Sequence, residues 1–414
     1  MSQPSLIYYN LRPSRVEHQP TLFAAHRLGY RVLLVTDQPA LDVPRDVVRE
    51  QVVVDTYDVG AALAAGRRLA RAHRVDGVLT WSDRDVNTVA LLAEELGLPG
   101  PPPEAARIAR NKYRMRQAMS AHPELVPRFR HVGTWVEAEA AAADIGYPAI
   151  LKPTVAAGSI AIFELHNADD LLRAFDTLTQ HIRPTVNPIF GRGVSQLIYE
   201  EFLTGTEHSV EGYVRNEEVT VAGITDKETL PPFHTEVGHV FPTALGEPER
   251  EAVLALTSQV IKVFGLDDCV FHLECKVDKG RAKLIEAAAR GGGDYITSHL
   301  VPLATGQSFH ENAIRVATGA APVAAGEPVF HAGVKKIVTP DAGVFEGFAG
   351  LAEANATPGV EHIVLERAIG EHVAPPPEDY TGCVLGSVIA RAATRAELVH
   401  RLDTLTKTLA PVIR

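Results

Sequence analysis

Residues 270–294 read VFHLECKVDKGRAKLIEAAARGGGD, and this stretch decides the fold of the chain. A turn at Asp278-Lys-Gly280 separates two largely apolar segments, 270–277 and 282–286. Apolar and polar residues alternate in the first segment, as they do in a strand with one buried face. The stretch therefore predicts an antiparallel strand pair joined by a tight turn.

Two carboxylates and a guanidinium make this strand pair a candidate site. Alternation places Glu274 on one face of the first strand, and Glu286 lies beside it if the strands pair. Two neighbouring carboxylates repel unless a cation joins them, and Mg²⁺ binds one or two carboxylates together with phosphate oxygens. Arg290 follows beside three glycines, which leave room for a close ligand. The stretch predicts a site for magnesium and a nucleotide.

The residues before Gly100 alternate short apolar segments with helical patterns. Strands that alternate with helices predict a parallel α/β sheet. The segment Gly100-Pro-Pro-Pro103 marks its end, because consecutive prolines are stiff and do not continue a helix. The expected strands are Ser5–Tyr9, Arg31–Thr36, Gln51–Asp55 and Gly77–Trp81, and the expected helices are Leu22–Leu28, Gly60–His73 and Asp85–Leu96.

The rest of the chain mixes longer helices with paired strands, and one segment rich in Pro, Gly and His, Pro231–Thr243, predicts a loop. Beyond Val329, short strands separated by Gly or Pro predict a β-rich end, and a helix closes the chain. The expected helices are Glu104–Ala121, Glu137–Ala143, Glu249–Phe264 and Arg395–Leu409. The expected strands are Pro148–Pro153, Val194–Phe202, His208–Val214, Glu218–Ile224, Ala332–Val338, His362–Leu365 and Val384–Ala390.

Two lysines are candidates for phosphate binding. Lys152 follows the apolar segment Pro148–Leu151, and a lysine that ends a buried strand needs an anion or an exit to water. Lys112 lies in a Lys/Arg-rich helical segment, which is normally a solvated face. The loop Ala157-Gly-Ser159 is small enough for backbone N–H groups to approach a phosphate, although an ordinary turn between strands has the same composition.

Acidic residues close one expected strand and open the next. Glu200 and Glu201 come at the end of the first strand, and Glu207 starts the second. A chain that crosses between two lobes can offer backbone groups to an adenine edge and a carboxylate to ribose hydroxyls. An acidic surface hairpin is the alternative interpretation.

The composition excludes several classes of protein. The formal net charge of −11 is opposite in sign to that of proteins that wrap nucleic acid, and no basic stripe suits an anionic membrane. The 414 residues, 46% of them hydrophobic, are enough for two to four domains. The chain has three cysteines without a CxxC pair, and it shows no signal-peptide pattern and no long apolar segment. These features predict a cytoplasmic protein without nucleic-acid or membrane partners.

Together and in this order, these patterns resemble the ATP-grasp superfamily, and most closely its biotin-carboxylase-like branch, which includes bacterial L-amino-acid (dipeptide) ligases. The resemblance spans almost the whole chain. It implies an α/β and α+β multidomain protein with the ATP-grasp fold, a Rossmann-like (pre-ATP-grasp) domain before it and a β-rich cap after it. The implied division is an N-terminal domain at 1–103, a helical linker and small ATP-binding lobe at 104–200, a large lobe with the metal and substrate site at 201–328, and a cap at 329–414.

The resemblance also implies roles for individual residues. The cofactors are ATP and Mg²⁺, with Mn²⁺ as an alternative ion. ATP would be bound by Lys112, Lys152, Gly158, Ser159, Glu200, Glu201, Phe202, Leu203 and Glu207, the metal by Glu274 and Glu286, and the reacting groups by Arg290 and Gly293.

The chain departs from the family at one metal position. Many members carry Glu-x-Asn-x-Arg where this chain has Glu286-Ala-Ala-Ala-Arg290, so Ala288 replaces the Asn. That Asn commonly helps to hold a second magnesium ion. The sequence therefore leaves open whether one or two ions bind.

Three further residues are candidates for substrate selection. His234 and His239 lie in the expected loop, where they can meet an ammonium or a second carboxylate, and Glu211 can face the same cavity. An ordered surface loop with incidental histidines is the alternative.

The resemblance implies a ligase that activates a carboxylate as an acyl phosphate and joins it to an amine, giving an amide, ADP and phosphate. The partners would be small-molecule carboxylates and amines of the amino-acid type, and the dimer common in this branch is left open. A biotin-dependent-type carboxylase, a purine-pathway-type ligase and a degenerate nucleotide-binding module remain as alternatives.

Overall fold

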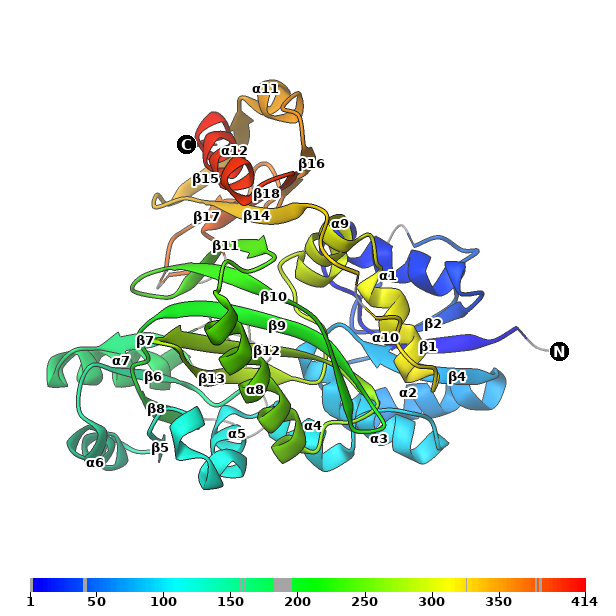
Figure 1. The fold of residues 1–414 in the computed structure, drawn as a ribbon, viewed down its shortest axis with the longest axis horizontal. Coiled ribbons are helices and arrows are strands. Elements are labelled where there is room, and N and C mark those ends of the chain that lie inside the picture. Colours follow the sequence, from blue (N-terminus) through cyan, green and yellow to red (C-terminus); the bar gives the residue numbers. More distant parts are fainter. Residues whose placement is uncertain are drawn as a thin grey trace.

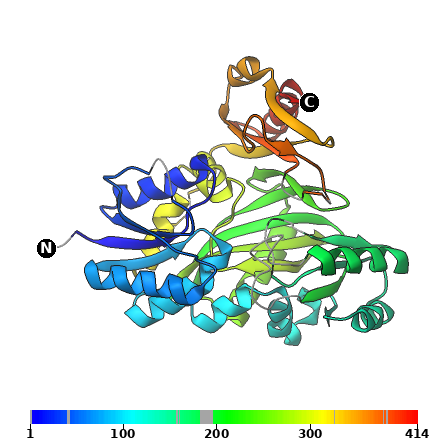
Figure 2. The same cartoon turned by 180° about the vertical axis from the view of Figure 1, so that it is seen from behind.

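The structure of the protein is a computed structural model, which describes residues 3–39, 43–155, 158, 161–181, 196–324, 326–376, 378–379 and 382–414. Figure 1 shows the N-terminal α/β unit on one side of a large central sheet, a smaller lobe on the other side and the C-terminal part above. The reverse view in Figure 2 agrees with this arrangement. Among the described residues, no helix is long and apolar enough to cross a membrane.

A four-stranded parallel sheet in the order β3-β2-β1-β4 forms the N-terminal unit. All five residues of β1 are buried, as expected for a parallel strand covered on both faces. The segment Phe309–Ala317 (α10) shares the core under this sheet although it lies far away in the sequence. The elements are β1 (Ser5–Tyr9), α1 (Arg15–Arg27), β2 (Arg31–Thr36), β3 (Val48–Val53), α2 (Val59–Ala72), β4 (Val75–Thr80) and α3 (Val86–Leu96).

The linker after this sheet contains two short helices, α4 (Pro103–Ala109) and α5 (Lys112–Ala118), and not the single helix expected over 104–121. Asn111 breaks the helix because it adopts an extended backbone, and its side chain accepts a hydrogen bond from the Arg114 N–H at 3.0 Å. This cap starts α5 at Lys112, whose backbone N–H donates to the Thr154 carbonyl of the small lobe at 2.8 Å.

The small lobe is an antiparallel sheet in the order β5-β8-β6-β7 with two helices packed against it. Its strands pair so that the end of β6, with Lys152, runs beside β8. The elements are β5 (Phe129–Val132), α6 (Trp135–Ile145), β6 (Ala149–Pro153), β7 (Phe163–Leu165), α7 (Ala168–His181) and β8 (Leu197–Glu201).

The central sheet has eight strands in the order β13-β12-β9-β10-β11-β14-β18-β16. The long helix α8 (Glu247–Phe264) packs its apolar face against β12 and β13. The expected loop at 231–243 is wrong in its second half, where β11 pairs on both sides, with β10 and with β14. The first five strands in chain order are β9 (Thr206–Arg215), β10 (Glu218–Leu230), β11 (Thr235–Phe241), β12 (Cys269–Asp278) and β13 (Arg281–Ala288).

The C-terminal part continues this sheet through β14 and adds a small three-stranded sheet, β17-β15-β19. A final strand follows the last helix, so the expectation that a helix closes the chain is wrong. The remaining elements are η5 (Ile296–Leu300), α9 (Val301–Thr305), β14 (His331–Val338), β15 (Gly343–Ala349), α11 (Leu351–Asn355), β16 (Val360–Leu365), β17 (His372–Val373), β18 (Val384–Ala392), α12 (Arg395–Thr408) and β19 (Ala410–Ile413).

Candidate functional site

A cavity of about 590 Å³ lies where the small lobe, the central sheet, the N-terminal unit and the C-terminal part meet. This volume is in the range of small-molecule and cofactor pockets. Most of the site residues predicted from the sequence line it. Those in the lining are Lys112, Lys152, Gly158, Glu200, Glu201, Phe202, Leu203, Glu207, His234, His239, Glu274, Glu286, Arg290 and Gly293.

The strand pair at 270–294 forms as the sequence predicts. Glu274 on β12 lies opposite Glu286 on β13, and a register shift after this pair leaves Ile285 without a partner residue. Burial disfavours charge on both carboxylates, but the Lys227 ammonium lowers the pKa of Glu274 and the Lys112 ammonium lowers the pKa of Glu286. Both residues are therefore anionic, and two negative groups lie side by side in the cavity.

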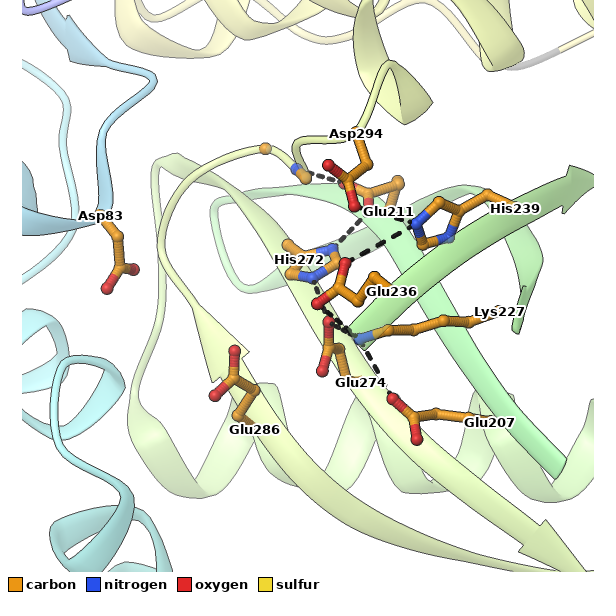
Figure 3. A network of polar contacts seen from close by, with 12 residues as sticks. Asp83, Glu207, Glu211, Lys227, Glu236, His239, His272, Glu274, Glu286 and Asp294 are labelled. Carbon is orange, nitrogen blue, oxygen red and sulfur yellow. Dashed lines mark hydrogen bonds and ion pairs between the residues drawn. The ribbon is translucent and has the colours of Figure 1, made fainter. Parts of the chain in front are cut away.

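Lys227 on β10 lines the cavity and joins several acidic side chains in a network of polar contacts (Figure 3). Its side chain is only 2% exposed, and its ammonium lies 2.8 Å from Glu274, 3.1 Å from Glu207 and 3.1 Å from Glu236. Burial opposes the charge of this lysine, yet the three carboxylates raise its pKa. The ammonium holds acidic side chains of β9, β11 and β12 in one cluster.

Sequence reasoning missed Lys227. The expected strand ended at Ile224, whereas β10 continues to Leu230 and places Lys227 in register with Glu207 on β9 and His239 on β11. The signal available in the sequence was a lysine shortly after the expected strand.

Glu200 on β8 forms a second buried charge cluster. Lys152 lies 2.7 Å from one of its oxygens and Arg116 lies 2.7 Å from the other. Burial opposes the charge of Glu200, but the two cations lower its pKa to about 2. Arg116 also donates to the Ile285 carbonyl at 2.6 Å, which connects the small lobe and α5 to the metal-candidate strand. Arg116 was missed because a Lys/Arg-rich helix normally faces solvent.

The segment between the lobes lines the cavity as expected for a hinge. The Phe202 N–H donates to the Pro148 carbonyl at 3.2 Å, and the Phe202 ring lies under the Lys276 ammonium and beside the His234 ring. Gly158 is exposed with φ of +74°, and its neighbours Ala157 and Ser159 lie outside the described residues.

The turn after β13 brings two guanidinium groups together. Arg290 Nη1 and Arg12 Nη2 both donate to the Gly291 carbonyl, at 3.1 and 3.0 Å. Arg290 also lies 3.4 Å from Asp83, which is itself paired with Arg110. Arg12 belongs to the N-terminal unit, and sequence reasoning missed it because a single loop arginine carries no pattern.

Glu211 holds this turn and is absent from the lining of the cavity. Its carboxylate accepts the Gly292 N–H at 2.8 Å and lies 2.5 Å from His272 Nδ1, and its side chain is fully buried. A Cβ at position 292 would overlap with this carboxylate, so a larger residue there would have to displace the Glu211 side chain. Burial opposes the charge of His272, but Glu211 raises its pKa to about 9.

The far end of the cavity is built from three parts of the chain. His239 lies between Glu236 and Asp294, at 3.7 and 3.2 Å, and Lys336 of the C-terminal part lies 2.7 Å from Asp294. The ligand atoms of Glu236, His239 and Asp294 lie close enough together to hold a metal ion. However, Lys227 and Lys336 already supply positive charge beside these carboxylates.

Tyr295, which has φ of +64°, connects α1 of the N-terminal unit with the C-terminal part. Its N–H donates to Glu17 of α1 at 3.2 Å, and its hydroxyl donates to Glu366 after β16 at 2.6 Å. Glu17 and Glu366 both line the cavity. The C-terminal part therefore closes this end, and the N-terminal unit forms one wall.

Three family models match the chain: ATP-grasp N-terminal domain at residues 22–100, ATP-grasp domain at 145–299, and L-amino acid ligase C-terminal domain 2 at 336–414. Alanine–anticapsin ligase of Bacillus subtilis (strain 168) is 30% identical over 239 residues, which cover 55% of this chain and 50% of that protein. Human carnosine synthase 1 is 28% identical over 274 residues, covering 63% of this chain and 33% of that protein. The chain thus matches half or less of the length of these two relatives.

Among solved structures, the L-amino acid ligase from Bacillus licheniformis superposes with a TM-score of 0.84, at 22% identity and with all of both chains covered. A biotin carboxylase from Campylobacter jejuni superposes with a TM-score of 0.71, at 17% identity and with 99% of this chain and 92% of that chain covered. These likenesses confirm the predicted fold class. The chain belongs to the ATP-grasp superfamily and carries the C-terminal domain of the L-amino acid ligases.

Proposed function

We propose that the chain is an ATP-dependent ligase that joins a carboxylate to an amine of the amino-acid type. The observation that carries the proposal is the pair of carboxylates, Glu274 and Glu286, that lie opposite each other on paired strands in one cavity with Arg290. The names of the matched relatives, alanine–anticapsin ligase and carnosine synthase 1, are those of enzymes that make amide bonds between amino-acid-type compounds. The C-terminal family match points in the same direction.

The donor set suits magnesium and a nucleotide. Glu274 and Glu286 offer the anionic oxygens that Mg²⁺ prefers, and the bound ion would neutralise phosphate oxygens during transfer. Lys112 and Lys152 would bind phosphate oxygens, and residues 201–203 with Glu207 would hold the nucleoside.

One metal ion is the better fit to these residues. Ala288 supplies no ligand atom, and Lys227 already places one fixed positive charge against Glu274. This lysine would do part of the charge balancing that a second ion does elsewhere in the family.

The reaction would begin when a substrate carboxylate oxygen attacks the γ-phosphorus and the bond to the bridging oxygen of ADP breaks. The amine nitrogen would then attack the acyl carbon, the bond to phosphate would break, and the nitrogen would lose its proton to the departing phosphate. Arg290 would neutralise the acyl phosphate and the tetrahedral oxyanion. Asp83 orients Arg290, and because Glu211 engages the Gly292 N–H, Gly293 is the better candidate for the backbone contact.

The test is an ADP-release screen of amino acids, singly and in pairs, with mass spectrometry of the products. We expect ADP release that depends on both an acid and an amine, and a product with the mass of the amide. Incorporation of labelled bicarbonate without an amide would instead support a carboxylase. Nucleotide binding without turnover for any pair would support a degenerate module.

A further inference from the structure

Arg12 reaches the cavity from the N-terminal unit. It lies in the loop after β1, and β1 sits between β2 and β4, so this loop leaves the carboxyl edge of the parallel sheet where the strand order reverses. Crevices at such switch points are the usual ligand sites of open α/β sheets. The loop crosses to the glycine turn, where the Arg12 guanidinium donates to the Gly291 carbonyl and lies against Gly293.

In the described part of the chain, Arg12 has carboxylates near it, chiefly that of Glu17, but none at ion-pair distance. Among the described residues, no carboxylate oxygen lies within 4.0 Å of its guanidinium. In contrast, Lys112, Lys152 and Lys336 in the same cavity each form an ion pair. Arg12 instead has Arg290 beside it, because both donate to one carbonyl oxygen. Two adjacent guanidinium groups in a cavity repel unless anions join them.

We propose that Arg12 binds the carboxylate of the substrate that supplies the amine and so selects substrates that carry this group. The inference rests on the proposed function. Arg290 is assigned to the carboxylate that becomes the acyl phosphate, which leaves Arg12 for a second anion. In an α-amino acid, the carboxylate carbon is only two bonds from the attacking nitrogen, so its binding group must lie next to the acyl site, as Arg12 does.

A guanidinium suits this task because it matches a carboxylate with two parallel hydrogen bonds. An amine without a carboxylate would leave the half-buried Arg12 beside Arg290 without a direct ion pair, which disfavours the binding of that amine. Arg12 is in this account a binding residue that selects the substrate.

The test compares wild type with Arg12→Met and Arg12→Lys. The probes are the standard L-amino acids as amine donors and their L-amino acid amides, which keep the amine and lose the carboxylate charge. Arg15→Met is the matched control, since Arg15 is exposed at the start of α1. Circular dichroism and the KM for ATP report whether each variant is folded.

We expect Arg12→Met to raise the KM for the amino acid by about ten- to hundredfold, with a smaller rise for Arg12→Lys. The KM for ATP and the KM for the amide should stay within about twofold of wild type. Titration calorimetry with the amino acid and a non-hydrolysable ATP analogue should show the same loss of affinity.

Equal losses for the amino acid and its amide would overturn the inference, as would a rise in the KM for ATP of the same size. In both cases wild-type ligation would persist, so the proposed function would stand. If wild type released no ADP with any pair, the proposed function would fall and this inference with it.

Discussion

The two ends of the cavity are built differently. At the nucleotide end, cations and carboxylates form ion pairs: Lys152 and Arg116 with Glu200, and Lys112 with Glu286. At the substrate end, the side chains come from the loop after β1, the turn after β13 and the C-terminal part. Arg12 has no carboxylate at ion-pair distance there, as far as the described residues go.

This difference indicates which end of the cavity can vary in sequence. The nucleotide end is neutralised by its own residues and lies largely within the ATP-grasp segment, so it suits a part common to many ligases. The substrate end exists only when three parts of the chain are assembled. We therefore expect changes at the first end to impair nucleotide binding or turnover and changes at the second to alter selectivity.

The largest expected effect is that of Glu274→Gln. The amide keeps the shape but removes the negative oxygen that would hold the metal, so kcat should fall about a thousandfold. ADP release measures this, and Glu228→Gln, an exposed position on strand β10 of the same sheet, is the control. Turnover close to wild type in Glu274→Gln would refute the metal assignment.

Lys227→Met tests whether one ammonium connects the two ends. Three carboxylates around a buried ammonium would lose their shared cation, which should lower the free energy of unfolding by about 3 kcal/mol and raise the KM for both ATP and substrate. Lys335→Met removes a more exposed ion pair with Glu228 and should cost about 1 kcal/mol or less. Urea unfolding compares the two variants. Equal losses of stability would show that Lys227 has no special role.

Glu207→Gln tests the nucleotide end of the cavity alone. Removing one charged hydrogen-bond acceptor for the ribose should raise the KM for ATP about tenfold and leave the KM for the amino substrates unchanged. Initial-rate kinetics with each substrate varied in turn measures both constants. A rise confined to the amino substrates would mean that Glu207 belongs to the other end.

The smallest expected effect lies at Asp85, which anchors the loop that carries Arg12. Its carboxylate accepts a 2.7 Å hydrogen bond from Asn10, the first residue of that loop, and Arg84 and Asp37 lie nearby. Burial raises the pKa of Asp85 to about 6, although Asn10 opposes this shift. The folded state thus holds the proton more tightly than the unfolded state, and this contribution to stability is lost as pH rises from about 4 through about 6.

Asp85→Asn removes this titration while keeping an acceptor for Asn10. It should therefore raise the free energy of unfolding at pH 7 by about 2 kcal/mol and change it much less at pH 4. The exposed Asp46→Asn should show no such pH-dependent gain. A gain for Asp85→Asn of the same size at both pH values would contradict the explanation.

The sequence was informative where a pattern is local. Alternation and a turn were enough to predict that Glu274 and Glu286 lie on paired strands, and the strands β1 and β2 were predicted to the residue. The superfamily followed from the order of such patterns. Glu211 shows the limit of this approach, because only its contact with the Gly292 N–H reveals that it supports the turn.

The other residues depended on contacts between distant segments. Lys227 meets carboxylates from three other strands, one of them in the segment expected to be a loop. Arg12 meets the glycine turn across 279 positions of sequence. Asn111 separates α4 from α5 because it caps α5. Composition alone does not distinguish such a cap from a solvated position inside one continuous helix.

The most direct test of the central claim is a crystal structure with Mn²⁺ and a non-hydrolysable ATP analogue, with the metal located by its anomalous scattering. The account predicts one manganese ion that contacts both Glu274 and Glu286, with the terminal phosphate on the side of Arg290. Bound nucleotide with no metal between these two carboxylates, and Glu274 and Glu286 still held only by Lys227 and Lys112, would contradict it.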